Sequence, residues 1–453
     1  MRFKIRNFGP IVDADLKLGM LNVFTGGNSV GKSYIHYLIW CLMSTEPNFS
    51  EILSLASDKA REYLKSREPT KLKEFVIEFF ERFDTIWKNA IIEQLKDTFV
   101  VNELSELILV GEQESIIDIS NDKGSMNIVF RILPGGLEIG KLDKIISYLD
   151  EKLDIDRVEE MNKLSITIDG EEIYSIPVEE KVDELAVKFA STIPHIYDSI
   201  LDGFIMYSST YILPDGRAGL LRARETLLYY LLSVRERVFM NSVDRSFIRD
   251  LEALSPLIKC KKIAALSSFL ERKLGVYYKL GREPPRYTVK IQVHREKTVE
   301  LPLVRAPSGI RELAPLVYLM KHALEGGDIL FIEEPEAHLH PDAQSIVVRT
   351  LAGLTNEQVR ILMTTHSIHV LDELSNLLRL AKLSPDEKME LGYNEWEGIS
   401  PDIVRIYHVR LDGRVKEVKA SDDGLDETGL DEVVGEIARL HASVERRFYG
   451  SRA

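Results

Sequence analysis

Residues 1–24 alternate between apolar and polar positions in the manner of half-buried strands. Residues 3–8 and 11–18 each keep one face apolar, and Gly9 and Pro10 between them supply a turn. Residues 21–24 are apolar at three of four positions and predict a buried strand. The chain therefore opens with three predicted strands, and the third leads into a glycine-rich loop.

A helical period replaces this alternation between residues 49 and 99. Apolar side chains recur three and four positions apart, and Pro69 separates two predicted helices because proline disfavours helix at the residue before it. The aromatic residues Phe75, Phe79 and Phe80 could be taken for a cofactor site, but a seam between packed helices explains their spacing more simply. The segment predicts a helical insertion.

Residues 115–180 return to short alternating runs separated by turns. Asp169 and Gly170 lie between two such runs, which is a strong hairpin signal. We expect an antiparallel sheet here, without visible chemistry. Beyond it, residues 203–208 predict a strand of the core sheet, and residues 220–280 predict a long helical region.

Strands alternate with helices from residue 287 onward. Two alternating runs precede a helix predicted for residues 308–324, and two largely apolar strands follow at 328–332 and 359–364. Such alternation predicts a parallel sheet with helices packed on it. A hairpin around Asp412 and Gly413, a polar linker and a closing helix complete the chain.

The loop after the third strand fits G-x-x-x-x-G-K-[ST], the phosphate-binding P-loop. Its position between a buried strand and an apolar helix is the context that the motif requires. Glycines let backbone N–H groups approach phosphate oxygens, and the helix N-terminus adds its positive dipole end. Lys32 can reach the β- and γ-phosphates, and the Ser33 hydroxyl can bind Mg²⁺.

Three further motifs carry candidate chemistry. Glu333 and Glu334 end an apolar strand, where one carboxylate can hold Mg²⁺ and the other can activate water, although an acidic turn without function is the alternative. Ser308 and Gly309 offer a hydroxyl and N–H groups to an anion, but such residues usually cap a helix. His366 follows the next buried strand and can donate to a γ-phosphate, whereas a lone histidine is more often structural.

Composition and charge limit the class of protein. The chain has 453 residues, 45% of them hydrophobic, and a formal net charge of −14. No apolar run approaches the roughly 20 residues that span a bilayer, and the first residues are strand-like rather than a signal peptide. Cys41 and Cys260 are far apart and form no C-x-x-C pair, which argues against a disulfide framework or a cysteine zinc site. We expect a cytoplasmic protein with no membrane segment.

One stretch departs from this acidic balance. Residues 217–290 hold about nine more basic than acidic side chains. Such a segment can contact nucleic acid or an acidic partner, and a solvated helical face is the alternative.

The order of these motifs resembles the ABC-type ATPases of the SMC/RecF/OLD-like group. The string FIEEPEAHLHP at residues 331–341 is similar to their Walker B motif and D-loop and is the most specific match. Residues 364–367 resemble their H-loop, and residues 307–311 resemble a shortened signature motif. Residues 7–11 and 211–222 also resemble strings found in these ATPases.

The resemblance implies that the chain binds ATP and Mg²⁺ and hydrolyses the ATP. Ser33 and Glu333 would hold the metal, while Glu334, His366 and Lys32 would serve catalysis. Because these ATPases sandwich two nucleotides between head-to-tail protomers, a homodimer is expected, in which Ser308 and Gly309 complete the site of the second subunit. The ATP-binding residues would be Gly26, Gly27, Asn28, Ser29, Val30, Gly31, Lys32, Ser33, Ser308 and Gly309.

Three departures from the family pattern stand out. Glu333 occupies the place where transporter-like relatives carry aspartate, although OLD-like members share the glutamate. A Q-loop glutamine cannot be placed, and the region of Asp215 and Arg217 is the nearest candidate. No zinc hook or long coiled coil is present. His338 and His340 could suggest a metal pair, but the D-loop explains them better.

The predicted fold class is therefore α/β, a P-loop NTPase of the ABC ATPase type with a mixed central sheet, an antiparallel β part and helical insertions. Two functions remain open. One is an ATPase that acts on nucleic acid in DNA repair or in defence against mobile elements. The other is a nucleotide-gated scaffold that hydrolyses ATP slowly and holds or regulates a partner effector protein. The acidic balance and the short stretch of about 87 residues after His366, too few for a typical nuclease domain, favour this alternative.

The motifs and composition divide the chain into six predicted segments. They are 1–45, the N-terminal part of the ATPase core with the P-loop; 46–105, a helical insertion; 106–200, a β-rich segment; 201–285, a core strand and a basic helical subdomain; 286–420, the C-terminal part of the core; and 421–453, a linker and C-terminal helix.

Overall fold

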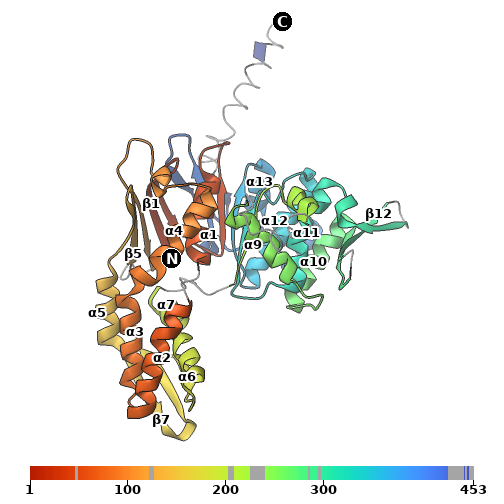
Figure 1. Ribbon diagram of the computed structural model, residues 1–453. Helices are drawn as coiled ribbons and strands as arrows, with labels where there is room; N and C mark the ends of the chain where they lie inside the picture. The colour runs from red at the N-terminus through yellow and green to blue at the C-terminus, as the bar shows by residue number, and fades with distance from the viewer. Residues whose placement is uncertain are drawn as a thin grey trace. The chain divides into compact units, whose positions relative to one another are not determined.

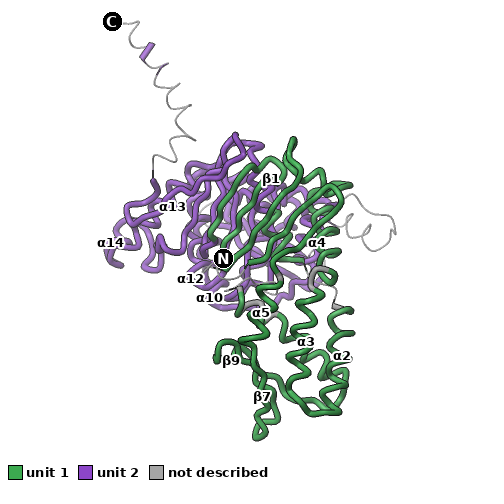
Figure 2. The backbone as a smooth tube through the Cα atoms, turned by 90° about the vertical axis from the view of Figure 1, so that its left-hand side faces the viewer, with its two compact units in different colours: residues 1–17, 37–208 green, residues 18–36, 209–453 purple. Residues whose placement is uncertain are grey.

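The computed structural model describes residues 1–45, 49–121, 127–201, 209–224, 240–283, 286–293, 297–426, 443, 446 and 447. The chain forms two compact units (Figure 2). Unit 1 consists of Met1–Lys17 and Tyr37–Ser208, and unit 2 of Leu18–His36 and Ser209–Ala453. The strand predicted at residues 203–208 lies outside the described residues, and so does the closing helix predicted from Leu430, except for residues 443, 446 and 447, which are helical. The six-segment division stays a prediction.

The central sheet of unit 2 is mixed and mostly parallel, as the alternation of strands and helices predicts (Figure 1). The first five strands run parallel, and the last pairs antiparallel with its neighbour. In order across the sheet, the strands are β10 (Thr210–Leu213), β14 (Ile329–Glu333), β15 (Arg360–Thr365), β3 (Leu21–Thr25), β16 (Val404–Val409) and β17 (Val415–Val418). Every residue of β3 and β14 is buried, which explains their nearly continuous apolar sequences.

Asn22 is the polar exception in β3. It is fully buried, and its side-chain amide donates to the carbonyl oxygens of Gly19 and Ile361 at 3.0 Å each. A buried amide that is satisfied in this way costs little, so the apolar strand tolerates it.

The carboxyl ends of the parallel strands lie at one edge of the sheet. Thr25 at the end of β3 is in register with Thr365 of β15, and Glu333 of β14 is in register with Thr364. Because chain segments that follow neighbouring parallel strands leave from the same edge, the P-loop, the Glu333–Glu334 pair and His366 all start there.

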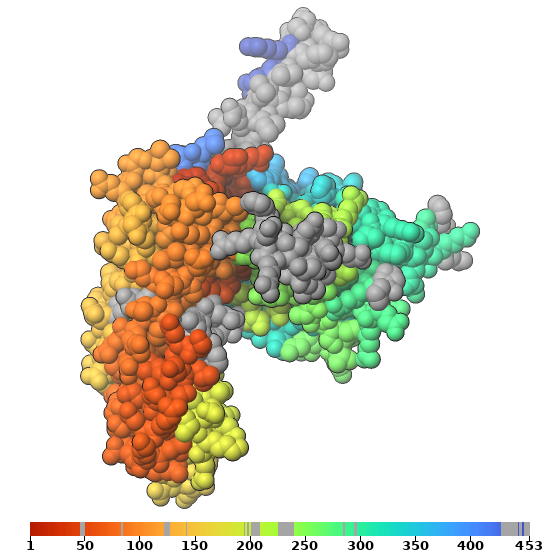
Figure 3. Space-filling view, in the orientation of Figure 1, coloured from red at the N-terminus to blue at the C-terminus, as the bar shows by residue number. Residues whose placement is uncertain are grey.

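Helices and a small sheet complete unit 2. Its α-helices among the described residues are the first turn of α1 (Lys32–Ser44), α9 (Ser242–Ala253), α10 (Lys261–Leu274), α11 (Ser308–His322), α12 (Pro341–Asn356), α13 (Ile368–Leu380) and α14 (Pro385–Glu390). An antiparallel sheet contains β11 (Val276–Leu280), β12 (Tyr287–Gln292) and β13 (Thr298–Pro302), and its far end forms a projection of this unit (Figure 3). The pair β18 (Ala420–Ser421) and β19 (Gly424–Leu425) lies near the end of the described chain.

The helix predicted through residue 280 is wrong at its end, because residues 276–280 form strand β11. Gly275 adopts a φ of 65° and ends α10 as a left-handed C-cap. The following residues alternate between buried and exposed positions, and this period of two fits a strand rather than a helix.

Unit 1 contains two antiparallel sheets. The larger has the order β2 (Ile11–Lys17), β1 (Arg2–Phe8), β4 (Ser115–Ser120), β5 (Asn127–Leu133) and β6 (Gly136–Gly140). The smaller contains β7 (Leu153–Val158), β8 (Lys163–Ile168) and β9 (Glu171–Pro177). The predicted hairpin at Asp169–Gly170 is confirmed, since both residues take the positive φ values, 53° and 82°, that a tight hairpin turn requires.

The helices of unit 1 differ in number from the prediction. Residues 49–99 form three helices instead of two, and a further helix, α5, interrupts the predicted β-rich stretch. Besides the later turns of α1, the described helices of this unit are α2 (Phe49–Ser66), α3 (Thr70–Glu81), α4 (Phe83–Phe99), α5 (Leu142–Lys152), α6 (Val182–Ala190) and α7 (Thr192–Leu201). The aromatic stripe of α3 is a core seam, in which the Phe75 ring centroid lies 6.2 Å from that of Phe189. Within the described residues, no helix is long and apolar enough to cross a membrane.

Candidate active site

The P-loop is held tightly at its first residue. Gly26 follows β3 with a φ of 145°, and a Cβ atom at this position would collide with the carbonyl oxygen of Val409 at the end of β16. Only glycine tolerates both conditions. Gly27, Asn28 and Ser29 are exposed, so their backbone N–H groups are accessible to a phosphate at the N-terminus of α1.

Lys32 is the cation at the centre of this edge. Its side chain is only 5% exposed, and its ammonium group donates to the carbonyl oxygens of Gly26 at 3.2 Å and Gly27 at 2.7 Å. Burial lowers the pKa of Lys32 to about 8, while the carboxylates of Glu334, Glu333 and Glu336 oppose this shift. The lysine is therefore folded back on its own loop and surrounded by negative charge.

His366 lies between Lys32 and Glu334. Its Nδ1 atom is 3.4 Å from the Lys32 Nζ atom, and its Nε2 atom is 3.4 Å from the Glu334 Oε1 atom. Burial and then the neighbouring Lys32 charge lower the pKa of His366, against the effect of Glu334. The imidazole is therefore neutral at pH 7 and can donate one hydrogen bond.

The two Walker B carboxylates have different surroundings. Glu333 is 3% exposed, and its Oε2 atom accepts from the backbone N–H of Asp215 at 3.4 Å. Glu334 lies on the turn that follows, with a φ of 40° and a side chain that is 40% exposed. Its backbone N–H donates to the Thr364 carbonyl oxygen at 3.1 Å. The buried carboxylate suits a metal ligand, and the exposed one can meet water.

Arg217 fixes the backbone that carries these carboxylates. Its guanidinium, 1% exposed, donates to the Glu333 carbonyl oxygen at 2.6 Å and to the Glu334 carbonyl oxygen at 3.2 Å. It also forms a buried ion pair with Glu312 of α11 at 3.3 Å. The sequence marks Arg217 only as a Q-loop candidate and gives Glu312 no role, because nothing in the local pattern shows that they meet.

Ser308 and Gly309 stand apart from the residues around Lys32. Ser308 is exposed at the first turn of α11, and among the described residues no hydrogen bond or ion pair joins it or Gly309 to the P-loop. Gly309 packs against the D-loop, where an added Cβ would lie 2.7 Å from the His338 carbonyl oxygen. The structure thus brings Lys32, Glu334 and His366 together and leaves Ser308 facing outward.

The D-loop histidines have backbone roles. The Nδ1 atom of His340 accepts from the Asp342 N–H at 3.4 Å and caps α12, while His338 adopts a left-handed φ of 60°. Among the described residues, no group of three or more His, Cys, Asp or Glu side chains could hold a metal ion. Exposed Ser33 and buried Glu333 fit Mg²⁺ only when phosphate oxygens supply further ligands, as Mg²⁺ sites at nucleotides do.

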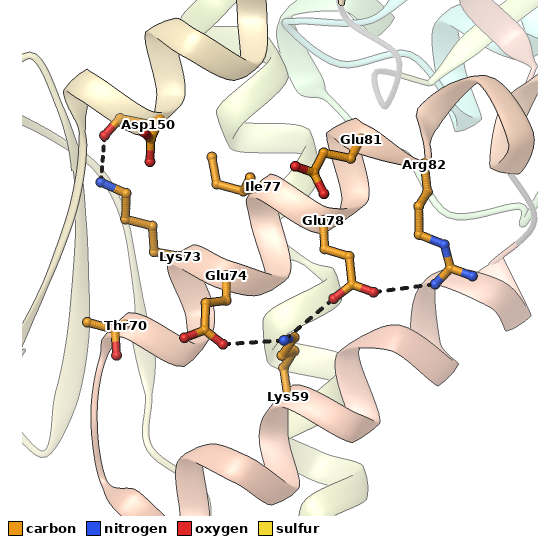
Figure 4. A pocket seen from close by; sticks show the side chains of 9 residues that line it. All are labelled: Lys59, Thr70, Lys73, Glu74, Ile77, Glu78, Glu81, Arg82 and Asp150. Atoms are coloured by element: carbon orange, nitrogen blue, oxygen red, sulfur yellow. Dashed lines mark hydrogen bonds and ion pairs between the residues drawn. The ribbon is translucent and has the colours of Figure 1, made fainter. Parts of the chain in front are cut away.

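A separate groove lies on the helices of unit 1 (Figure 4). Its volume is about 590 Å³, and residues of α2, α3 and α5 line it. Lys59 pairs with Glu74 at 3.3 Å and with Glu78 at 3.5 Å, and Lys73 donates to the Asp150 carbonyl oxygen at 2.8 Å. These charges satisfy one another, so the groove is a surface ion-pair network rather than a reactive site.

The geometry places the P-loop lysine beside a histidine and a carboxylate at one edge of a parallel sheet. Residues 206–372, which include Arg217, Ser308, Glu334 and His366, match the family described as "AAA domain, putative AbiEii toxin, Type IV TA system". Over these residues, the match agrees with the ATPase motifs recognised in the sequence. A comparison with curated proteins gives no match.

Several solved SMC head structures resemble the chain. The SMC head bound to the C-terminal winged-helix domain of ScpA has 11% identity and a TM-score of 0.41, covering 93% of this chain and 97% of that chain. An SMC head with an extended coiled coil, bound to the C-terminal domain of ScpA from Pyrococcus furiosus, has 12% identity and a TM-score of 0.38, covering 96% and 98%. The SMC head domain from Thermotoga maritima has 11% identity and a TM-score of 0.35, covering 92% and 97%.

The lowered pKa of Lys32 predicts a pH dependence of ATP binding. Phosphate favours the charged lysine, so binding must return a proton to Lys32 once the pH exceeds its pKa of about 8 in the free protein. At pH 9 we expect an uptake of about 0.9 proton per ATP and an affinity that falls about tenfold per further pH unit.

Calorimetry in buffers of different ionisation enthalpy measures this uptake. Lys32→Ala serves as the control and should show weak binding without the proton uptake at pH 9. If wild type binds ATP at pH 9 without taking up a proton, the cation described here is not the one that meets the phosphates.

Proposed function

We propose that this chain binds Mg²⁺-ATP at residues 26–33 and hydrolyses it with Glu334, His366 and Lys32. The observation that carries the proposal is the position of His366, 3.4 Å from both Lys32 and Glu334 at the sheet edge where the P-loop begins. A cation, a neutral histidine and a partly exposed carboxylate at one point suit phosphoryl transfer to water.

Each residue has a distinct task in this proposal. Lys32 would exchange its two loop carbonyl partners for phosphate oxygens. Ser33 and Glu333 would hold Mg²⁺, which neutralises charge on the phosphates when bound. Glu334 would orient and polarise the attacking water, and the neutral imidazole of His366 would donate to the γ-phosphate.

The site is completed by a second copy of the chain in this proposal. Ser308 is exposed at the N-terminus of the 15-residue helix α11, where a hydroxyl and free N–H groups can meet an anion. In the ABC-type ATPases that the motifs resemble, the corresponding groups contact the nucleotide of the opposite protomer, which supports the same role here. Residues 308 and 309 then contribute to ATP binding in trans, and hydrolysis depends on a homodimer.

A role on nucleic acid, in repair or in defence against mobile elements, is the biological part of the proposal. The description of the matching family names a toxin of a type IV system, which supports defence. The described chain also offers basic side chains on the surface of the basic stretch with no ion pair among the described residues, namely Lys261, Arg272, Lys273, Lys279 and Arg282.

A nucleotide-gated scaffold that holds a partner effector protein is the second candidate. The favouring observation is that much of the basic stretch is neutralised internally. Arg224 and Arg286 share the carboxylate of Glu252 at 2.6 and 3.3 Å, and Arg217 is committed to Glu312. Lys259, Lys262 and Lys290 form surface pairs with glutamates. Fewer cations are therefore free for phosphate contacts than the sequence indicates.

Turnover and oligomeric state test the enzymatic proposal. Lys32→Ala should abolish measurable ATP hydrolysis because the phosphates lose their cation. Glu334→Gln should lower kcat about 10²- to 10³-fold, because the water loses its carboxylate while binding is preserved. With Mg²⁺-ATP, Glu334→Gln should elute as a dimer in size-exclusion chromatography. Equal turnover in all three proteins would refute hydrolysis at this site, and a persistent monomer would refute the sandwich.

The salt dependence of DNA binding separates the two candidate roles. If Arg272 and Lys273 contact phosphates, their double alanine variant should lower the slope of log Kd against log salt by about 2. Lys65→Ala/Lys144→Ala removes two exposed charges from unit 1 and is the matched control, with an unchanged slope expected. Absence of binding even at low salt would favour the scaffold.

A further inference from the structure

We propose that Glu336 is the positioning residue that holds His366 between Lys32 and Glu334. This inference deepens the proposed ATPase function and rests on it. Glu336 lies on the D-loop, two residues after Glu334, and neither the motif resemblance nor the family match gives its side chain a task.

Both polar groups at the start of the H-loop donate to one oxygen of Glu336. The Thr365 hydroxyl donates to its Oε1 atom at 2.5 Å, and the backbone N–H of His366 donates to the same atom at 3.1 Å. The Thr365 hydroxyl in turn accepts from the Ser367 N–H at 3.0 Å. One carboxylate oxygen thus fixes the backbone on which the imidazole is carried.

The burial of Glu336 makes these contacts costly to lose. The residue is 8% exposed, and its Oε2 atom is buried with no hydrogen-bond partner. Burial raises the pKa of Glu336, and the nearby Glu334 charge acts in the same direction. Burying a carboxyl group with one oxygen that makes no hydrogen bond lowers the stability of the folded protein. A role in function therefore explains its position better than a role in stability.

A second contact ties the same two loops together. Gln344 of α12 donates to the D-loop carbonyl oxygen of Leu339 at 3.1 Å and accepts from the Ser367 hydroxyl at 2.6 Å. Its partner on the H-loop is one residue beyond His366, whereas Glu336 holds the His366 backbone directly. Glu336 is therefore the shorter link between the D-loop and the imidazole.

Besides a hydrogen bond to the backbone of Gly26, the imidazole has two long contacts. His366 is 32% exposed at its side chain, and its two contacts to Lys32 and Glu334 are long, at 3.4 Å each. Its position therefore depends on these contacts together with its own backbone, which Glu336 holds. A shift of about 1 Å at a catalytic group can lower a rate about 100-fold.

Glu336→Ala is the test, measured in the full-length protein with ATP and Mg²⁺. We expect kcat to fall about 10- to 100-fold while KM for ATP stays within about threefold, because no P-loop contact is removed and Glu336 has the smallest effect of the three carboxylates on the pKa of Lys32. Glu336→Gln should restore most of kcat, since the amide oxygen can accept both hydrogen bonds. Thr365→Val removes one of the two and should give an intermediate loss, which provides a test if the alanine variant does not fold.

Glu373→Ala is the matched control. Glu373 is also a buried carboxyl of unit 2, 6% exposed, with a raised pKa caused by burial and with one unpartnered oxygen, but it contacts Tyr393 instead of the H-loop. Its loss should lower the melting temperature without changing kcat. An equal fall of kcat in the Glu336→Ala and Glu373→Ala variants, or no fall in Glu336→Ala, would overturn the assignment.

Hydrogen exchange distinguishes failure of this inference from failure of the proposed function. In nucleotide-free protein, the segment 364–368 should exchange faster in Glu336→Ala than in wild type or Glu336→Gln, because the His366 N–H loses its acceptor. An unchanged exchange rate refutes the positioning role whether or not the protein hydrolyses ATP. A wild type that exchanges as expected but does not turn over ATP refutes the proposed function alone.

Discussion

The burial of one ammonium group beside three carboxylates is the constraint on which this site depends. Removing Lys32 from water lowers its pKa to about 8, and only the charges of Glu334, Glu333 and Glu336 limit that loss. Two carbonyl oxygens of the P-loop supply its hydrogen bonds. A cation held in this way is desolvated and preorganised, so an incoming phosphate can replace the carbonyl partners without drawing a hydrated lysine out of solvent.

The sheet of unit 2 positions the groups of this site. Parallel pairing brings the ends of β3, β14 and β15 to one edge, and the close contact between Gly26 and the Val409 carbonyl fixes where the P-loop begins. Arg217 then donates hydrogen bonds to the carbonyl groups of Glu333 and Glu334, while its own charge is balanced by Glu312. A buried ion pair of this kind fixes the local geometry but adds little to the free energy of unfolding.

Sequence reasoning reaches the fold class and most of the central sheet, because fully buried parallel strands and a P-loop have strong local signatures. It misses α5, although Ile145 and Leu149 are buried four positions apart, because the helix lies among strand-like runs. It also extends a helix over β11, where the left-handed Gly275 is the only local stop signal. In such short segments, tertiary packing determines the secondary structure more strongly than the local sequence pattern does.

The residues of the site also differ in whether the sequence reveals them. Motif residues such as Lys32 and His366 stand out in the sequence, whereas Glu336, Arg217 and Glu312 act through contacts across long stretches of chain. The Arg217–Glu312 pair joins residues 95 positions apart, and no spacing rule shows such a partnership. Buried ion pairs and loop-holding carboxylates are features of the folded state, so only the structure reveals them.

The central claim is that each ATP site combines Lys32, Glu334 and His366 of one protomer with Ser308 of another. Mixing two inactive variants, Lys32→Ala and Ser308→Arg, tests it most directly. In a mixed dimer, the intact P-loop of one chain faces the intact Ser308 of the other, so one complete site forms. The account predicts ATP turnover in the mixture that neither variant shows alone. A mixture no more active than the sum of its parts, with dimers shown to form, would contradict it.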